Sequence, residues 1–153
     1  MEIRVDDLRG PQVAQLLEDH LRDLARHSPP ESMHALDLAA LRKPEITFWC
    51  AWQESELLGC GALKELDPRH GEVKSMRTAD QHLRKGVAAA IVRRILEEAG
   101  RRSYLRLSLE TGSGPAFAPA QRLYSRFGFE PCAPFADYVL DPHSVYMKRI
   151  LRP

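Results

Sequence analysis

The chain has 153 residues, of which 44% are hydrophobic and 28% charged, and its formal net charge at pH 7 is +1. This length predicts one domain, residues 1–153, with enough apolar residues for one core. The near-neutral charge argues against a nucleic-acid-binding module, which would carry a strong excess of Lys and Arg on one face.

The N-terminus and the cysteines together indicate a cytoplasmic protein that does not enter a membrane. The first residues, MEIRVDDL, lack the apolar run of a signal peptide, and no segment approaches the roughly 18 apolar residues of a membrane span. The three cysteines, Cys50, Cys60 and Cys132, are odd in number and lack metal-ligand spacing. We therefore expect reduced thiols, mostly buried in strands, and no metal site.

The first half of the chain predicts a strand, two helices and a hairpin. Residues 1–5 form a short strand, and Pro11 then begins a helix, since Pro is favoured in the first helical turn. Apolar residues recur at helical spacing along it: Val13, Leu16, Leu17, Leu21 and Leu24. The segment HSPPES ends this helix, and a shorter helix follows over residues 34–41. Two β-rich runs, 46–53 and 56–65, flank a short turn and predict a hairpin.

The second half alternates strands and helices. The expected elements are strands 72–78 and 104–110, a helix over 87–100, a helix that carries Ala120, Leu123 and Tyr124 and ends near Gly128, and one or two closing strands within 138–140 and 144–151. A strand, helix, strand order indicates a crossover with parallel pairing, whereas the hairpin adds antiparallel pairing. The sequence therefore predicts an α/β (α+β) fold with a mixed sheet of six to seven strands and helices on both faces.

The segment DQHLRKGVAAAIV places a glycine, Gly86, between two cationic residues and an apolar helix. The N–H groups at a helix start are unpaired, and the helix dipole adds partial positive charge there. Glycine allows the backbone to approach an anion closely, so this turn is a candidate site for a diphosphate. The alternative is a helix start with a tolerated glycine and two solvated charges.

Two blocks of the chain resemble the GNAT family of N-acetyltransferases. The first runs from Leu83 to Ala88 and is similar to the family's acyl-CoA-binding motif, Gln or Arg, two residues, Gly, one residue, then Gly or Ala. The second, PAQRLYSRFGFEP, looks like the family signature Ala-x-x-Leu-Tyr-x-x-x-Gly-Phe. The blocks lie in the family order with a strand between them. The resemblance implies the acyl-CoA N-acyltransferase fold over nearly the whole chain.

This sequence departs from the family pattern at two positions. Leu83 stands where the family usually has Gln or Arg, which removes a side-chain contact to phosphate that Arg84 could replace. Phe117 stands where many members carry an Asn that contacts the cofactor arm. Both departures concern the cofactor site rather than the fold.

The resemblance implies transfer of an acetyl group from acetyl-CoA to a primary amine by direct attack. It makes Glu72 the candidate general base, although a strand Glu can equally pair with a neighbouring Lys or Arg. It makes Tyr124 the candidate general acid for the leaving thiolate, the alternative being a core tyrosine. Strand alternation places Glu72, Lys74, Met76 and Thr78 on one face and Arg77 on the other, where a salt bridge is expected.

The same resemblance implies where acetyl-CoA lies. The backbone of Met76 and Thr78 would follow the acyl-pantetheine arm, in a slot where this strand diverges from residues 104–110. The diphosphate would reach the amides of six residues: Leu83, Arg84, Lys85, Gly86, Val87 and Ala88.

The acceptor is expected to be a small-molecule amine. In the family, the first two helices, their loop and the C-terminal strands form the acceptor pocket. Here those segments contain five polar candidates: His27, Glu31, His34, Asp137 and Tyr138. A protein amine as acceptor, or a non-catalytic acyl-CoA-binding module, are the alternative functions, and a homodimer is one option for assembly.

Overall fold

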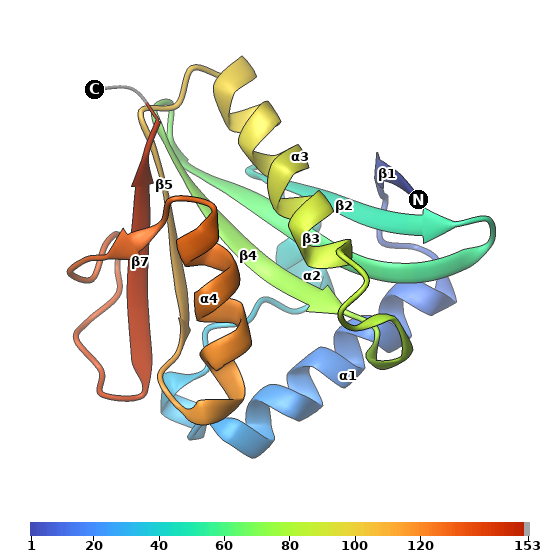
Figure 1. The fold of residues 1–153 in the computed structure, drawn as a ribbon, viewed down its shortest axis with the longest axis horizontal. Coiled ribbons are helices and arrows are strands. Elements are labelled where there is room, and N and C mark those ends of the chain that lie inside the picture. Colours follow the sequence, from blue (N-terminus) through green and yellow to red (C-terminus); the bar gives the residue numbers. More distant parts are fainter. Residues whose placement is uncertain (152–153) are drawn as a thin grey trace.

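A seven-stranded mixed sheet forms the centre of the computed structural model, which describes residues 1–151 (Figure 1). The strand order is β1-β2-β3-β4-β5-β7-β6. The strands are β1 (Glu2–Val5), β2 (Ile46–Gln53), β3 (Glu56–Asp67), β4 (His70–Thr78), β5 (Arg106–Gly112), β6 (Glu130–Pro131) and β7 (Ser144–Ile150). The α-helices are α1 (Pro11–His27), α2 (Leu38–Leu41), α3 (Val87–Arg101) and α4 (Ala118–Arg126), with 3-10 turns η1 (Pro30–Ser32), η2 (Asp80–His82) and η3 (Pro115–Phe117).

The expected mixture of pairing directions is confirmed. Each neighbouring pair in the sheet is antiparallel except β4 and β5, which α3 connects as a crossover and which run parallel. The parallel pair lies in the middle of the sheet, so helices can cover both of its faces (Figure 1).

Two clusters of buried side chains hold the helices against the sheet. On one face, α3 and α4 pack against inward-facing strand residues such as Trp49, Leu63 and Leu107. On the other, α1 and the segment around α2 pack against Phe48, Cys60 and their neighbours. Adjacent residues of one strand join different clusters, as strand alternation requires. None of the helices within residues 1–151 is long and apolar enough to span a membrane.

The cysteines are free thiols, as expected. Cys50 and Cys60 are completely buried in strands that face α1, and Cys132 is half-buried. Burial raises the pKa of the Cys60 thiol to about 12, and so keeps it protonated. Cys50 and Cys60 therefore act as small apolar core residues.

Several elements differ from the expected ones: β4 begins at His70 rather than Glu72, and β5 runs from Arg106 to Gly112 rather than over 104–110. Residues 138–140 form no strand, so β7 is the single closing strand after β6. The short helix α2 has four residues rather than eight. Helix α3 continues past Gly100, and the left-handed residue that follows the helix is Ser103, with φ +61°. The one-residue difference at the end of α3 lies within the usual variation of assigned helix ends.

Candidate active site

A slot opens in the sheet between β4 and β5. The two strands pair only from His70 to Val73 on β4, opposite Arg106 to Leu109 on β5. The remainder of β4 stays paired with β3 alone, and the strands diverge toward their C-terminal ends (Figure 1). A cavity of about 520 Å³ fills this opening and extends to α1, the segment after it, and α4. The expected slot is therefore present.

A bulge in β4 changes which side chains face the slot. Ser75 has a positive φ of +55°, and the register with β3 shifts there, so that Lys74 lies opposite Ala62 while Arg77 lies opposite Cys60. Ala62 and Cys60 both face α1. Glu72, Lys74 and Arg77 consequently share the α1 face.

The residues between them face the other helix layer. Met76 fills the space above Gly61, beside Ile91 of α3. Thr78 lies opposite Gly59 in the register with β3, and a Cβ added at Gly59 would point at Val87 of α3. The prediction that Met76 and Thr78 share the face of Glu72 is therefore wrong, because strict alternation ignores the extra residue of a bulge. Both still line the cavity.

Glu72 lies at the floor of the cavity in a network of three polar side chains. Only 2% of the residue is exposed. Lys74 Nζ donates to its Oε2 at 3.1 Å, and the Tyr138 hydroxyl donates to the same oxygen at 2.5 Å. Lys74 Nζ also donates to the Tyr138 hydroxyl, at 2.9 Å. Burial and the adjacent Glu72 carboxylate raise the pKa of Tyr138, so its phenol stays protonated. The alternative of an ion pair with a neighbouring Lys is thus realised, inside the cavity.

Tyr124 lines the same cavity from α4. The residue is 7% exposed, and its ring packs edge-on against Phe129 at 5.8 Å between ring centroids. Among residues 1–151 its hydroxyl makes no hydrogen bond to another side chain or to the backbone. Burial raises the pKa of Tyr124, with Glu110 adding to the effect, so the phenol is protonated at neutral pH.

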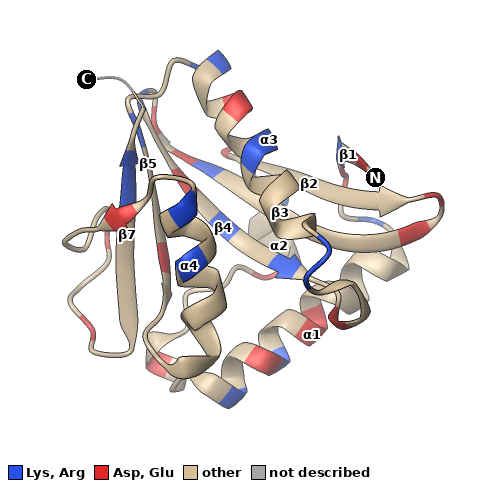
Figure 2. Ribbon diagram, viewed as in Figure 1, with Lys and Arg blue, Asp and Glu red and all other residues tan. Residues whose placement is uncertain are grey.

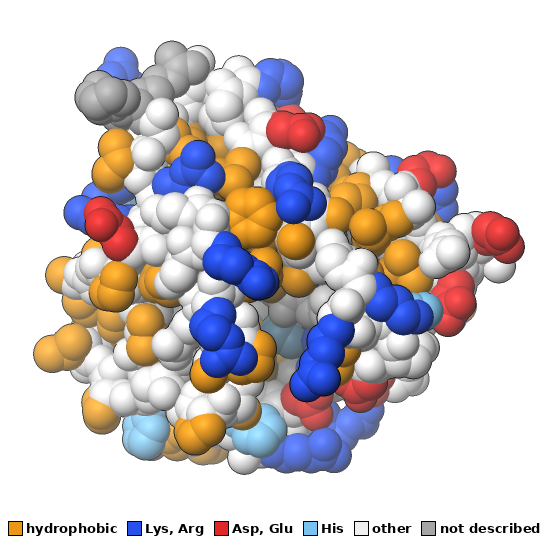
Figure 3. Space-filling view, viewed as in Figure 1, with side chains coloured by type: hydrophobic (Ala, Val, Ile, Leu, Met, Phe, Trp, Pro, Cys, Tyr) orange, Lys and Arg blue, Asp and Glu red, His pale blue; other side chains and the backbone are white. Residues whose placement is uncertain are grey.

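Helix α3 begins directly after Gly86, as the glycine motif predicted. Gly86 caps the helix with φ +81°, and Arg84 is also left-handed with φ +64°. Of the six residues expected at the diphosphate, Leu83 and Ala88 line the cavity, while Arg84, Lys85, Gly86 and Val87 lie outside it. Figure 2 shows Lys and Arg both in this turn and on α4, and Figure 3 shows a hollow between basic side chains on the same face.

The expected acceptor residues divide between the cavity and its surroundings. His27 and His34 line the cavity, whereas Glu31 and Asp137 do not. Tyr138 does not itself line the cavity, but its hydroxyl bonds to Glu72 and Lys74, which do. Ser28 and residues 32–35, in the segment that follows α1, also line the cavity. The sequence identifies these segments, but its patterns do not separate residues that point inward from those in solvent.

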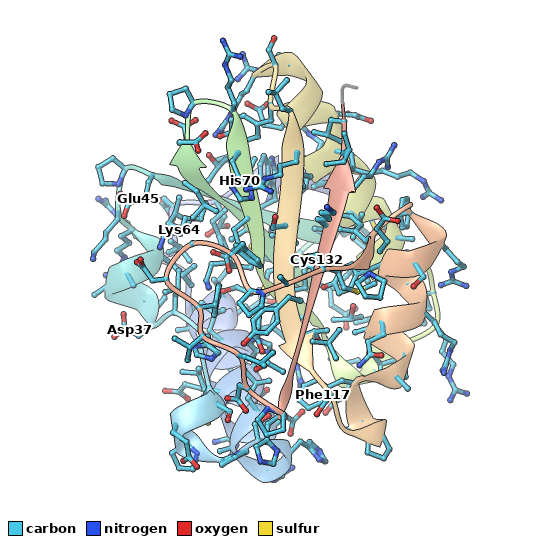
Figure 4. All side chains as sticks on the ribbon, turned by 90° about the vertical axis from the view of Figure 1, so that its left-hand side faces the viewer. Asp37, Glu45, Lys64, His70, Phe117 and Cys132 are labelled. Carbon is cyan, nitrogen blue, oxygen red and sulfur yellow. The ribbon has the colours of Figure 1, made fainter. Side chains whose placement is uncertain are left out.

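Arg77 and Phe117 also line the cavity. Arg77 forms ion pairs with Asp23 of α1 at 2.6 Å and with Asp80 at 3.3 Å, as the expected salt bridge. Phe117 covers Gly112 so closely that a Cβ there would have no room, and its ring meets His27 edge-on at 6.3 Å between centroids. Figure 4 shows Phe117 near the start of α4, at the opposite end of the sheet from His70.

A sequence profile described as "Acetyltransferase (GNAT) family" matches residues 12–129. The chain belongs to this family. It is 60% identical over 151 residues to an uncharacterized N-acetyltransferase, YsnE, of Bacillus subtilis, covering 99% of this chain and 100% of the relative. It is 51% identical to the uncharacterized N-acetyltransferase YedL of Escherichia coli, over 97% and 94% of the two chains. An IAA acetyltransferase of Azospirillum brasilense is 36% identical over 91% and 90%. The protein is therefore a GNAT N-acetyltransferase.

Solved structures share the fold at low sequence identity. A putative acyl-CoA N-acyltransferase from Klebsiella pneumoniae superposes with a TM-score of 0.79 at 23% identity, covering 98% and 97% of the two chains. An aminoglycoside 6'-N-acetyltransferase complexed with coenzyme A has a TM-score of 0.73 at 15% identity, over 100% and 98%. A GNAT acetyltransferase from Elizabethkingia anophelis with acetyl-CoA bound has a TM-score of 0.68 at 14% identity, over 98% and 97%.

Proposed function

We propose that this GNAT N-acetyltransferase moves an acetyl group from acetyl-CoA to the primary amine of a small molecule, by direct attack in a ternary complex in the cytoplasm. One observation carries the proposal: a continuous cavity connects the start of α3 at Leu83 and Ala88 with Glu72 and Tyr124. Acetyl-CoA as the donor draws support from two structural neighbours, one with coenzyme A bound and one with acetyl-CoA bound.

The start of α3 fits a diphosphate group. Its first amides have no partner within the helix, the first such bond being the one from Ala90 N–H to the Gly86 carbonyl. Two left-handed residues precede them, a conformation that turns successive N–H groups toward one side. Lys85, in the same turn, forms a hydrogen bond from Nζ to His82 Nδ1 at 3.2 Å. His82 Nε2 in turn lies 2.8 Å from Glu56 Oε1, which fixes the imidazole ring. These groups would bind the phosphates while the pantetheine arm enters the slot.

Glu72 would accept a proton from the amine. Lys74 and Tyr138 both bond to Oε2, which fixes the carboxylate and leaves Oε1 for the acceptor or for a bridging water. A base held by two partners keeps one orientation, which favours proton transfer because geometry limits that step. The alternative, a purely structural ion pair, predicts normal turnover when Glu72 becomes Gln.

Tyr124 would protonate the departing thiolate. Its hydroxyl lines the cavity from the α4 side without another role in the described fold, and its raised pKa keeps the proton available. A cavity enclosed by α1 and the Ser28–Ala35 segment favours a small molecule over a protein amine, since a polypeptide needs an open groove.

A screen of primary amines with acetyl-CoA, read by mass spectrometry, tests the proposal. We expect acetylated product with at least one small amine. Glu72→Gln should then lower turnover by roughly 10²–10⁴-fold, with the affinity for acetyl-CoA unchanged. The loss should shrink at high pH, where the amine deprotonates unaided. Glu97→Gln, at an exposed site on α3, is the matched control and should behave as wild type. Binding of acetyl-CoA without product from any amine or peptide would favour a non-catalytic module instead.

A further inference from the structure

Glu110 lies across the slot from the Glu72 network. Leu107 and Leu109 of β5 point into the core beneath α3 and α4, so Ser108 and Glu110 take the opposite face by alternation. Ser108 lies directly opposite Glu72 in the register of the two strands. Glu110 follows it by two residues, at the first position where β5 has left β4, and lines the cavity. It is therefore on the face of Glu72 and at the mouth of the slot.

Glu110 differs from every other charged residue that lines the cavity. The Asp, Glu, Lys and Arg residues that line the cavity are Asp23, Glu72, Lys74, Arg77, Asp80 and Glu110 itself. Within residues 1–151 all of them except Glu110 form an ion pair with one another. Glu72, Lys74 and Glu110 together carry one net negative charge when ionised. One ammonium group would neutralise it.

The surroundings of Glu110 make a cationic ligand favourable. Burial raises the pKa of this carboxyl, an effect that Ser144, His34 and Lys74 partly oppose and that the Glu72 carboxylate reinforces. A carboxylate that is partly desolvated and has no ion-pair partner is costly, and a bound cation removes that cost. His34, which also lines the cavity, packs edge-on against Tyr138 at 4.9 Å between ring centroids.

We propose that Glu110 binds the acceptor as its ammonium ion and holds the nitrogen between itself and Glu72. This assignment rests on the proposed function and adds the residue that selects a cationic acceptor. In the reaction, Glu72 takes one proton from the ammonium, and the nitrogen lone pair forms the C–N bond as the C–S bond breaks. The second proton lost from nitrogen replaces the one that Tyr124 gives to the thiolate sulfur. Glu110 stays ionised throughout.

A binding experiment tests this assignment without requiring turnover. Protein labelled with ¹³C-carboxyl glutamate is titrated with ethylammonium chloride, with ethanol and with sodium chloride at matched ionic strength. The Glu110 signal is identified by its loss in Glu110→Gln. We expect ethylammonium alone to shift this signal and to lower the pH at which it titrates. A Glu110 signal that responds to ethylammonium no more than to sodium chloride overturns the assignment.

Steady-state kinetics with an amine that the enzyme acetylates gives the second test. Glu110→Gln should raise KM for the amine roughly tenfold to hundredfold, the range for losing a hydrogen bond to a charged group, with kcat changing much less. Glu110→Asp should restore part of the affinity, and Glu97→Gln should change nothing. An unchanged KM for the amine in a folded Glu110→Gln enzyme refutes the role. Ethylammonium binding in a protein that acetylates no amine would instead refute the proposed function and Glu110's role toward an acceptor, while an ammonium-binding site at Glu110 would remain.

Discussion

Replacing Tyr124 with Phe separates chemistry from packing at the proposed acid. The ring, its edge-on contact with Phe129 and its buried volume all remain, and only the hydroxyl is lost. Because that hydroxyl bonds to no other described residue, its removal breaks no protein hydrogen bond. We therefore expect the free energy of unfolding to change by less than about 0.5 kcal/mol. The chemical step should slow by roughly tenfold or more, which corresponds to at least about 1.4 kcal/mol of barrier.

Tyr104→Phe is the matched control. This tyrosine is also buried in the core beneath α3, but its hydroxyl donates to Glu65 at 2.6 Å and accepts from Arg102 at 3.2 Å. Losing bonds to two charged groups should cost about 1–3 kcal/mol of stability. For a chain of this size each kcal/mol lowers the melting temperature by about 2–4 °C. The chemical step should be unaffected, because Tyr104 does not line the cavity.

Single-turnover kinetics is the appropriate assay, since product release can limit steady-state turnover. Enzyme in excess is mixed with labelled acetyl-CoA and saturating amine, and the product is quantified after rapid quenching. Calorimetry supplies the melting temperatures of both variants. Tyr124→Phe with a wild-type chemical step would refute the acid role. A large loss of stability in that variant would refute the claim that its hydroxyl has no structural partner.

The remaining predictions concern the helix start and an ion-pair cluster remote from the cavity. Gly86→Val places a branched side chain at φ +81°, and this backbone strain should destabilise the folded protein by about 1–3 kcal/mol. Calorimetry should show that the variant has lost most of its affinity for coenzyme A. Gly100→Ala, inside α3 with open space around it, is the control and should bind coenzyme A normally. Arg101 and Arg102 bond to Glu98 and hold the pKa of this carboxyl at about 2, below its ordinary 4.5. Because the folded-state pKa is depressed, the stabilisation is present above about pH 4.5 and is lost as the pH falls toward 2. Because solvent screens the ion pair with the exposed Arg101, we expect Glu98→Gln to lower the free energy of unfolding at pH 7 by only about 1–2 kcal/mol. Urea titrations should show that the difference in unfolding free energy between wild type and variant vanishes near pH 2. An equal difference at both pH values would contradict this reasoning.

The sequence by itself determined the features that depend on neighbouring residues. The turn around Gly86, the apolar stripe of α3 and the alternation of β5 are set by local backbone preference and by periodicity, and each is present in the structure. The two blocks that resemble GNAT N-acetyltransferases were enough to place the chain in that family, as the comparisons confirm.

Only the tertiary structure decided what faces the cavity and with which charge partner. The bulge at Ser75 arises from the register between β4 and β3, so no pattern within β4 alone could place Arg77 with Glu72 or Met76 with α3. Tyr138 reaches Glu72 across 66 residues of sequence. Within residues 1–151 Glu110 differs from the other Asp, Glu, Lys and Arg residues of the cavity because each of those has an ion-pair partner. Ion pairing depends on distances that folding sets between remote segments, and such distances leave no periodic signal in the sequence.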